Sequence, residues 1–256
     1  MSVFRIFTIQ TFLVLSLHCM YAQQPDTTQS VANFSGSVGL TNNGFSIIPT
    51  FSLNSPAVIM NLSWRKKRFS FDPDIRLVPD ASKGGMLFWL RYRIIEQQKF
   101  SVRLGVHPAF NLLRTEINDN GSTTKITELL RFGAGEVAPS YQISPNWSVG
   151  AIYLYGKALQ KRGPQNTHVL FFNTSVSNIK LGGQMRFQLI PMVYLLYTDA
   201  YKGSYFTATG ILSRKNFPFT LQSTINQTFK SDIPGNKNFI WNVQLSYNFS
   251  KNFKKV

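Results

Sequence analysis

A segment near the C-terminal end of the chain, Asn238 to Ser250, alternates apolar and polar side chains along its length. Polar side chains occupy the even positions, with Ile240 as the exception. The odd positions carry Phe239, Trp241, Val243, Leu245, Tyr247 and Phe249. Because a β-strand directs successive side chains to opposite faces, this segment has one apolar face and one polar face. Its aromatic residues lie toward the ends of the apolar face, which is typical of a strand that crosses a membrane beside a polar interior.

The N-terminal residues 1–22 have the features of a secretory signal peptide. Arg5 gives a positive start, and the apolar run from Phe7 to Leu17 is too short to span a bilayer as a helix. A small residue, Ala22, then precedes Gln23. We therefore expect cleavage after Ala22 and export of the chain.

The mature chain is expected to lack cysteine and to be strongly basic. Cys19 is the only cysteine and would leave with the signal peptide, so no disulfide or thiol chemistry is expected. Lipidation of Cys19 is an alternative, but His18 stands where that motif needs a small residue. Removing Arg5 leaves 26 Lys and Arg (27 minus 1) against 11 Asp and Glu, a net charge of +15.

That positive charge narrows the classes of partner. It suits lipopolysaccharide, other anionic lipid or small anions, and export of the chain argues against nucleic acid. The alternative is that part of the charge lies in hydrated turns. No protein partner can be named from the residues.

The alternation recurs along the chain and predicts 12 strands. They are expected at 44–53, 56–65, 68–78, 84–95, 99–113, 126–143, 146–158, 167–178, 181–199, 202–214, 217–230 and 238–250. Most of them reach the ~9–11 residues that a tilted spanning strand needs. Residues 23–43 are expected to form a lead segment, with 31–40 as a plug or a weak first strand, and 251–256 a C-terminal tail.

The connections between the predicted strands favour a membrane barrel over a soluble β-sandwich. Short and longer gaps alternate from the second gap onward, with 200–201 as the poor fit, as turns and outer loops alternate in outer-membrane barrels. A sandwich also alternates its side chains, but it explains neither a segment as long as 181–199 nor the 22 phenylalanines. We predict an all-β fold, a single closed antiparallel transmembrane β-barrel over 44–250 with an up-and-down meander, in the bacterial outer membrane. The long gaps 114–125 and 159–166 are expected to be exposed loops.

Charged residues on the polar faces are expected to point into the lumen. An arginine that faces lipid at the bilayer midplane would cost ~2–4 kcal/mol, which favours the inward direction. The expected lumen residues are Arg76, Arg91, Arg93, Arg103, Arg131 and Arg186, with Asp72, Asp74 and Glu136. In an open barrel these arginines would favour anions, whereas in a narrow barrel they would pair with the acids and hold the walls together.

Aromatic residues on the apolar faces are expected at the membrane interfaces. They are Trp64, Trp147, Trp241, Tyr247 and Phe249.

An outer-membrane hydrolase is the enzymatic alternative, and the sequence gives it little support. The mature chain has His107 and His168, and neither has a serine in the His-x-Ser arrangement of outer-membrane phospholipases. Asp72-Pro73-Asp74 is similar to the acidic pair of outer-membrane aspartyl-type proteases, but no Asp-x-His accompanies it. Spacings for a metal site and glycine-rich phosphate loops are absent from the sequence, so no metal or cofactor is predicted.

One series of motifs resembles a known group of proteins. It begins with Thr41 to Leu53 (TNNGFSIIPTFSL) and Ser55-Pro56-Ala57, and continues with Phe69 to Pro73 (FSFDP), Phe88 to Arg93 (FWLRYR) and Gly105 to Ala109 (GVHPA). The series resembles uncharacterised outer-membrane β-barrel proteins of Bacteroidota-type bacteria, and the Ala22-Gln23 junction is similar to their cleavage sites. The resemblance covers the first half of the mature chain and implies fold and location only.

Two functional hypotheses follow. The first is a non-enzymatic barrel that passes small anionic solutes through a basic lumen. The second is a closed structural or interaction barrel that binds lipopolysaccharide or a partner through loops 114–125 and 159–166.

Overall fold

The computed structural model describes residues 32–47, 51–119 and 122–253. The predicted signal peptide, residues 1–22, and the predicted lead up to residue 31 lie outside the described residues. The strands are β1 (Ala32–Thr41), β2 (Ala57–Lys66), β3 (Phe69–Leu77), β4 (Lys83–Glu96), β5 (Phe100–Asp119), β6 (Ser122–Ser144), β7 (Trp147–Ala158), β8 (Asn166–Gly182), β9 (Met185–Thr198), β10 (Tyr201–Arg214), β11 (Phe219–Ser231) and β12 (Phe239–Phe253). No helix in this part of the chain has the length and apolarity to cross a bilayer.

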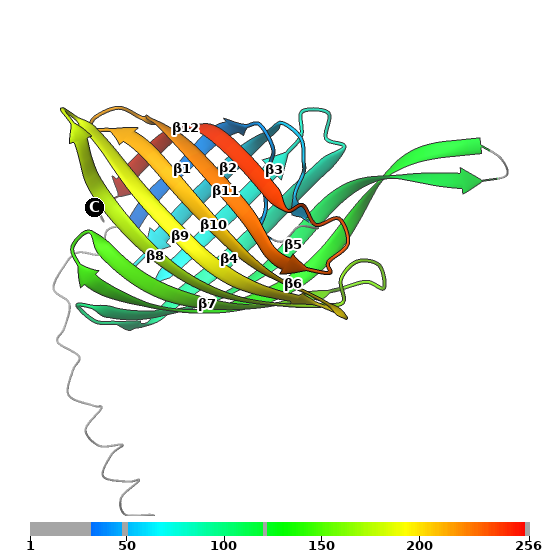
Figure 1. Cartoon of the computed structure of the whole chain (residues 1–256), viewed down its shortest axis with the longest axis horizontal. Coiled ribbons are helices and arrows are strands. Elements are labelled where there is room, and N and C mark those ends of the chain that lie inside the picture. The colour runs from blue at the N-terminus through cyan, green and yellow to red at the C-terminus, as the bar shows by residue number, and fades with distance from the viewer. Residues whose placement is uncertain (1–31, 48–50, 120–121, 254–256) are drawn as a thin grey trace, which may run out of the picture. The chain divides into compact units, whose positions relative to one another are not determined.

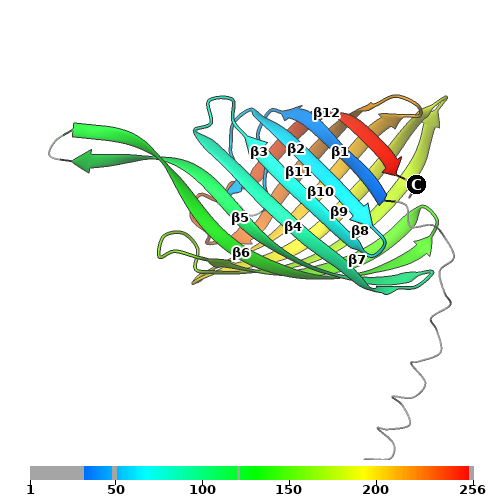
Figure 2. The same ribbon diagram turned by 180° about the vertical axis from the view of Figure 1, so that it is seen from behind.

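The strands form one closed barrel (Figures 1 and 2). Each strand pairs antiparallel with its neighbours in sequence, and β12 returns to pair with β1. The closing register runs from Ala32 opposite Phe253 to Thr41 opposite Gln244. The predicted fold class, a closed antiparallel meander of 12 strands, is therefore confirmed.

The first wall strand differs from the prediction. β1 spans Ala32–Thr41, the segment expected as a lead or weak strand, and the described residues of the predicted strand 44–53 do not pair into the wall. β1 is rich in small residues, and Gly39 lies so close to β12 that an added Cβ would meet the Leu245 carbonyl oxygen at 2.8 Å. Pairing with β12 and β2 stabilises β1 as a strand, although its composition alone gives only a weak preference for that conformation. β12 also continues to Phe253, into the predicted tail.

The described residues of segment 42–56 (42–47 and 51–56), which we call the inner loop, fold into the lumen. They lie at the barrel end opposite Ala32 and Phe253, the described ends of the chain, which we call the termini. The described part closes on itself, because Leu53 N–H donates to Gly44 O (3.1 Å) and Ser55 N–H donates to Asn43 O (3.0 Å). Gly44 has φ +58, and Leu53 packs against it where a Cβ would stand. The apolar side chains that suggested a strand are thus buried inside the barrel instead of facing lipid.

Two further strand boundaries differ from the prediction. The expected loop 114–125 is mostly paired, with Arg114 opposite Thr127 and Asp119 opposite Ser122, so β5 and β6 form a hairpin that projects beyond the barrel wall (Figure 1). The expected strand 181–199 contains a turn at Gly183 and Gln184, and Gly182 and Gly183 have φ +118 and +50. β8 ends there and β9 begins at Met185.

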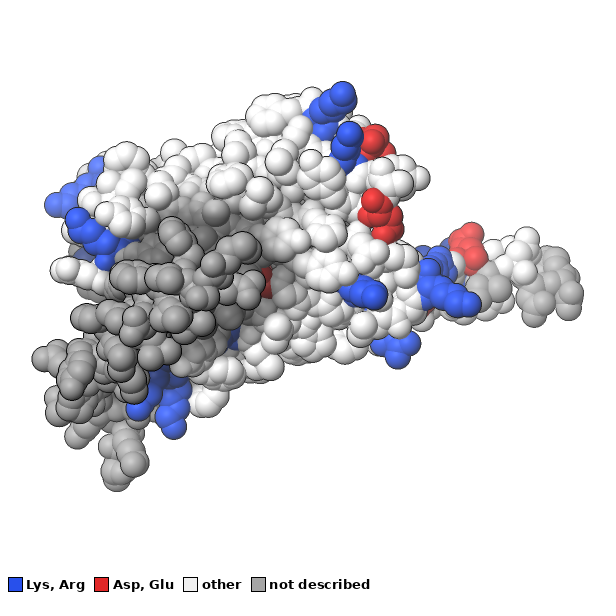
Figure 3. Space-filling model, turned by 90° about the horizontal axis from the view of Figure 1, so that it is seen from below, with Lys and Arg blue, Asp and Glu red and all other residues white. Residues whose placement is uncertain are grey.

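The outward face of the wall is apolar, and the inward face is polar. On β12, Phe239 and Trp241 are 56% and 55% exposed, whereas Asn242 and Gln244 are 4% and 7% exposed. On the face seen in Figure 3, charged side chains gather toward the two ends of the barrel and leave the wall between them largely uncharged. This is the arrangement that a spanning barrel requires.

The predicted interface aromatics all point outward. Trp64, Trp147, Trp241 and Tyr247 are exposed, and the Phe249 ring makes tilted contacts with the rings of Tyr247 and Phe34. Two indole N–H groups on this face find hydroxyl acceptors on the next strand, because Trp147 donates to Thr174 Oγ1 (2.8 Å) and Trp241 donates to Ser223 Oγ (2.9 Å). Such a hydrogen bond to the indole N–H is favourable where the rest of the ring lies in apolar surroundings.

Candidate functional site in the barrel lumen

Most of the predicted charged residues lie together on one side of the lumen, on β3 to β6. Their centre is Glu136 on β6, whose side chain is 4% exposed. Its Oε1 accepts from Arg91 Nε (2.8 Å) and from Arg103 Nε (3.0 Å). One carboxylate therefore joins β4, β5 and β6 across the inner face.

Arg91 connects that centre to a second acid, Asp72 on β3. Its guanidinium donates to Asp72 Oδ2 (3.1 Å), and the same carboxylate accepts from Ser63 (2.6 Å) and Ser70 (2.8 Å). The Arg91 guanidinium carbon also lies 4.2 Å from the centre of the Trp89 ring. Arg91 and Asp72 are each 18% exposed, so this pair is largely enclosed by its neighbours.

A third acid, Asp74, pairs with Arg76 on the same strand through two bonds of 3.2 and 2.6 Å. Arg76 also donates to the carbonyl of Phe45 (3.1 Å), and Lys83 donates to the carbonyl of Leu53 (3.4 Å). These contacts fix the inner loop to β3 and β4.

Aromatic residues of β9 and β6 also hold the inner loop. Tyr194 on β9 donates to the carbonyl of Ile47 (3.2 Å) and stacks on Tyr205, with ring centres 4.7 Å apart. On β6, Phe132 meets Phe51 edge-on at 5.1 Å. The half of the lumen away from the termini is thus filled by apolar contacts, which leave a cavity of about 90 Å³ bordered by Ser46, Arg76, His107 and Thr167 among others.

The half of the lumen nearer the termini contains a larger hollow with two arginine side chains in its lining. This hollow of about 440 Å³ is lined by Arg93, Glu96, Ser101 and Arg103, among others. The Arg93 and Arg103 side chains are 31% and 38% exposed, so their guanidinium groups are accessible. Arg93 pairs with Glu96 (2.5 Å).

Arg65 on β2 was not among the predicted lumen residues. It shares its face with Asn61 and Ser63 by strand alternation, and Ser63 bonds the inward-facing Asp72. That polar alternation is the signal that identifies it. Arg65 forms no salt bridge within the described residues.

Two other predicted residues do not join the cluster. The inward prediction for Arg131 is wrong: it is exposed and pairs with Phe110 on the outward face, between the buried Leu130 and Phe132. A residue five positions from Glu136 on one strand cannot share its face. Arg186 shares the lumen face of β9 with Tyr194, but its guanidinium donates to the carbonyls of Gly183 (3.3 Å) and Met185 (2.9 Å) instead of to an acid.

Neither histidine has the geometry of a hydrolase site. His107 is buried with its ring centre 3.9 Å from that of Trp89, and its Nδ1 has no hydrogen-bond partner in the described structure. His168 points outward and bonds Tyr153 Oη at 2.8 Å. Asp72 and Asp74 are engaged by serines and arginines, as salt-bridge partners would be.

Within the residues that the structure places, no three or more His, Cys, Asp or Glu side chains are grouped to hold a metal ion.

Comparison with known proteins supports the fold. No family model matches the sequence, and no curated protein matches it either. Among solved structures, the KdgM porin has a TM-score of 0.52 and 11% identity, covering 84% of this chain and 99% of that chain. An outer membrane channel from Pseudomonas putida F1 has a TM-score of 0.49 and 10% identity over 89% of this chain and 100% of that one. The NanC porin gives 0.47 and 11% over 87% and 100%.

LpxR from Salmonella typhimurium is also similar, with a TM-score of 0.47 and 8% identity over 84% of this chain and 99% of that chain. Identities this low show shared architecture only. The chain has the fold of an outer-membrane β-barrel.

The role of Glu136 gives a stability prediction. Replacing Glu136 by Gln leaves Arg91 and Arg103 without their shared counter-charge, and we expect a loss of about 3 kcal/mol in the free energy of unfolding. Replacing Glu116 by Gln should lower the free energy of unfolding by only about 0–1 kcal/mol, because its pair with Lys125 is exposed on the projecting hairpin. Urea unfolding of the barrel in detergent measures both, and equal losses would contradict the central position of Glu136.

Proposed function

We propose that the protein is an integral, non-enzymatic outer-membrane barrel that admits small anionic solutes to a basic lumen. The observation that carries the proposal is the hollow of about 440 Å³ beside the accessible guanidinium groups of Arg93 and Arg103. Guanidinium groups arranged around a water-accessible space bind carboxylate and phosphate groups with directed hydrogen bonds.

The charges in this part of the lumen leave a positive surplus. The acids are Asp72, Asp74, Glu96 and Glu136, and each has an arginine partner. The arginines exceed them: Arg65, Arg76, Arg91, Arg93 and Arg103, with Arg186 on the far wall. A single-sign surplus in a space with low-dielectric walls raises the local concentration of the opposite ion.

The inner loop restricts passage beyond the hollow. The barrel end away from the termini is the outer mouth in this proposal. An anion moving toward it meets the apolar contacts around Phe51, Phe132 and Tyr194, where it would lose its hydration. We therefore expect a small conductance, limited by movement of the inner loop.

The surplus of arginine predicts anion selectivity. In planar bilayers with a salt gradient, the reversal potential should favour anions, and the double variant Arg93→Gln with Arg103→Gln should shift it toward zero. The control is Arg131→Gln with Arg214→Gln, which removes the same charge from exposed residues on the outward face. Equal shifts for both pairs would mean that the lumen arginines do not select the ion.

The position of the inner loop in the lumen predicts that its removal changes the conductance. Replacing residues 44–53 by a Gly-Ser linker removes the contacts of Phe45, Ile47, Phe51 and Leu53, and the single-channel conductance should rise severalfold. If neither the native barrel nor this variant conducts, the transport proposal fails.

That outcome would favour the second candidate, a closed interaction barrel. The observation on its side is the apolar filling of the outer mouth together with the projecting β5–β6 hairpin. Arg162 of the 159–165 loop pairs with Glu128 (2.5 Å) and donates to Thr115 (3.4 Å), so loop and hairpin base form one continuous outer surface. Lipopolysaccharide or a protein would bind there.

A further inference from the structure

A hollow of about 370 Å³ lies on the wall at the end away from the termini, across β9, β10 and β11. Its lining includes Leu195, Tyr197, Lys202, Ser204 and Lys230. These residues are side by side, because Tyr197 pairs with Lys202, Leu195 pairs with Ser204, and Ser204 pairs with Lys230. Tyr197 and Leu195 are 48% and 40% exposed, which places the hollow on the outward, lipid-facing side.

The two lysines of this hollow are free to bind an anion. Lys202 and Lys230 are exposed and form no salt bridge within the described chain. Asp232 also lines the hollow, and its Oδ1 accepts from Lys202 N–H, while the two oxygens of Asp199 accept from the N–H groups of Gln165 and Asn166. Two ammonium groups therefore face one carboxylate, and neither lysine pairs with it in a salt bridge among the described residues. The ammonium groups remain available for an outside ligand.

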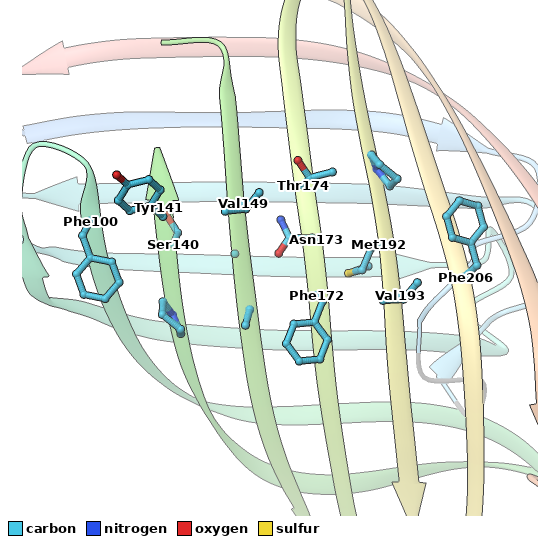
Figure 4. A pocket seen from close by; sticks show the side chains of 14 residues that line it. Phe100, Ser140, Tyr141, Val149, Phe172, Asn173, Thr174, Met192, Val193 and Phe206 are labelled. Atoms are coloured by element: carbon cyan, nitrogen blue, oxygen red, sulfur yellow. The ribbon is translucent and has the colours of Figure 1, made fainter. Parts of the chain in front are cut away.

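An apolar groove continues from this hollow toward the termini. The next outward pair along β9 and β10 is Val193 with Phe206, and both line a second hollow of about 620 Å³. Figure 4 shows Val193 between Phe172 and Phe206. Its floor includes Ala151 and Pro191; proline lacks an N–H, and the β8–β9 pairing is interrupted between Asn173 and Val176, opposite Pro191.

We infer that this outer wall binds a phosphate-bearing lipid of the outer leaflet, the lipid A of lipopolysaccharide. Its phosphate lies between Lys202 and Lys230, and an acyl chain follows Leu195 and Val193 into the groove beside Phe206. Charge at the rim followed by an apolar groove is the order in which a lipid presents its headgroup and its chains. The inference rests on the proposed outer-membrane location, in which an even number of strands with short periplasmic turns places both ends of the barrel chain in the periplasm. It does not require the lumen to conduct.

Native mass spectrometry of the folded mature barrel, titrated with bisphosphorylated lipid A in neutral detergent, tests the site. The double variant Lys202→Gln with Lys230→Gln should weaken binding roughly 10-fold to 30-fold, because each lysine beside an anionic lipid contributes about fivefold. Lipid A without phosphates should bind the native barrel and the double variant equally. The variant Ala151→Phe, which fills the groove, should weaken binding severalfold although both lysines are present.

The matched control is Lys66→Gln with Lys251→Gln. These lysines are also exposed on the outward face, at the end with the termini, where they pair with Ala32 and Phe34. Their removal should leave binding unchanged. Native affinity in the Lys202 and Lys230 variant, or the same loss in the control, would overturn the site, whereas an absence of conductance would bear only on the proposed function.

Discussion

The structure depends on the closure of the backbone hydrogen-bond ladder. Within lipid, no water is available for an unpaired N–H or C=O, so a spanning sheet must have no free edge. β1 meets this requirement by pairing all 10 of its residues with β12 on one side and with β2 on the other. Once the ring is closed, strand alternation sends every second side chain to lipid and the others to the lumen. The apolar outer wall and the polar interior are two consequences of that one constraint.

The charged interior follows from the same alternation. Arginine and acid side chains on β3 to β6 would cost free energy if they faced lipid. In the lumen they form ion pairs around Glu136 and Asp72. The pairs around Glu136 and Asp72 join β3, β4, β5 and β6. The hollow nearby has two arginines and one acid in its lining, Arg93, Arg103 and Glu96. The inner loop then fills the half of the lumen away from the termini with apolar contacts and leaves the arginine-lined hollow in the other half. The proposed anion selectivity and the proposed restriction of passage therefore have separate structural origins.

Much of this was predictable from the chain, and the failures have identifiable causes. The regular alternation of segments such as 238–250 was sufficient for the fold, and most lumen charges followed from their positions. The predicted number of 12 strands was reached only because the omission of β1 offset the wrongly predicted strand 44–53. The inner loop alternates Phe45, Ile47, Phe51 and Leu53 as a strand does, and only the presence of a lumen to fill decides where these side chains go. β1 was not predicted as a wall strand because its small residues give a weak strand pattern. These residues allow close approach of β1 to β12. The turn at Gly183 and Gln184 and the outward position of Arg131 were readable from glycine chemistry and from the parity with Glu136.

The central claim, that one face of every strand contacts lipid, is tested most directly by tryptophan fluorescence. The chain has 4 tryptophans, of which Trp64, Trp147 and Trp241 point outward and Trp89 is buried in the lumen. Variants that retain one tryptophan each, reconstituted in brominated lipid, should show strong quenching for the outward three and weak quenching for Trp89. Strong quenching of Trp89, or none for the other three, would contradict the account.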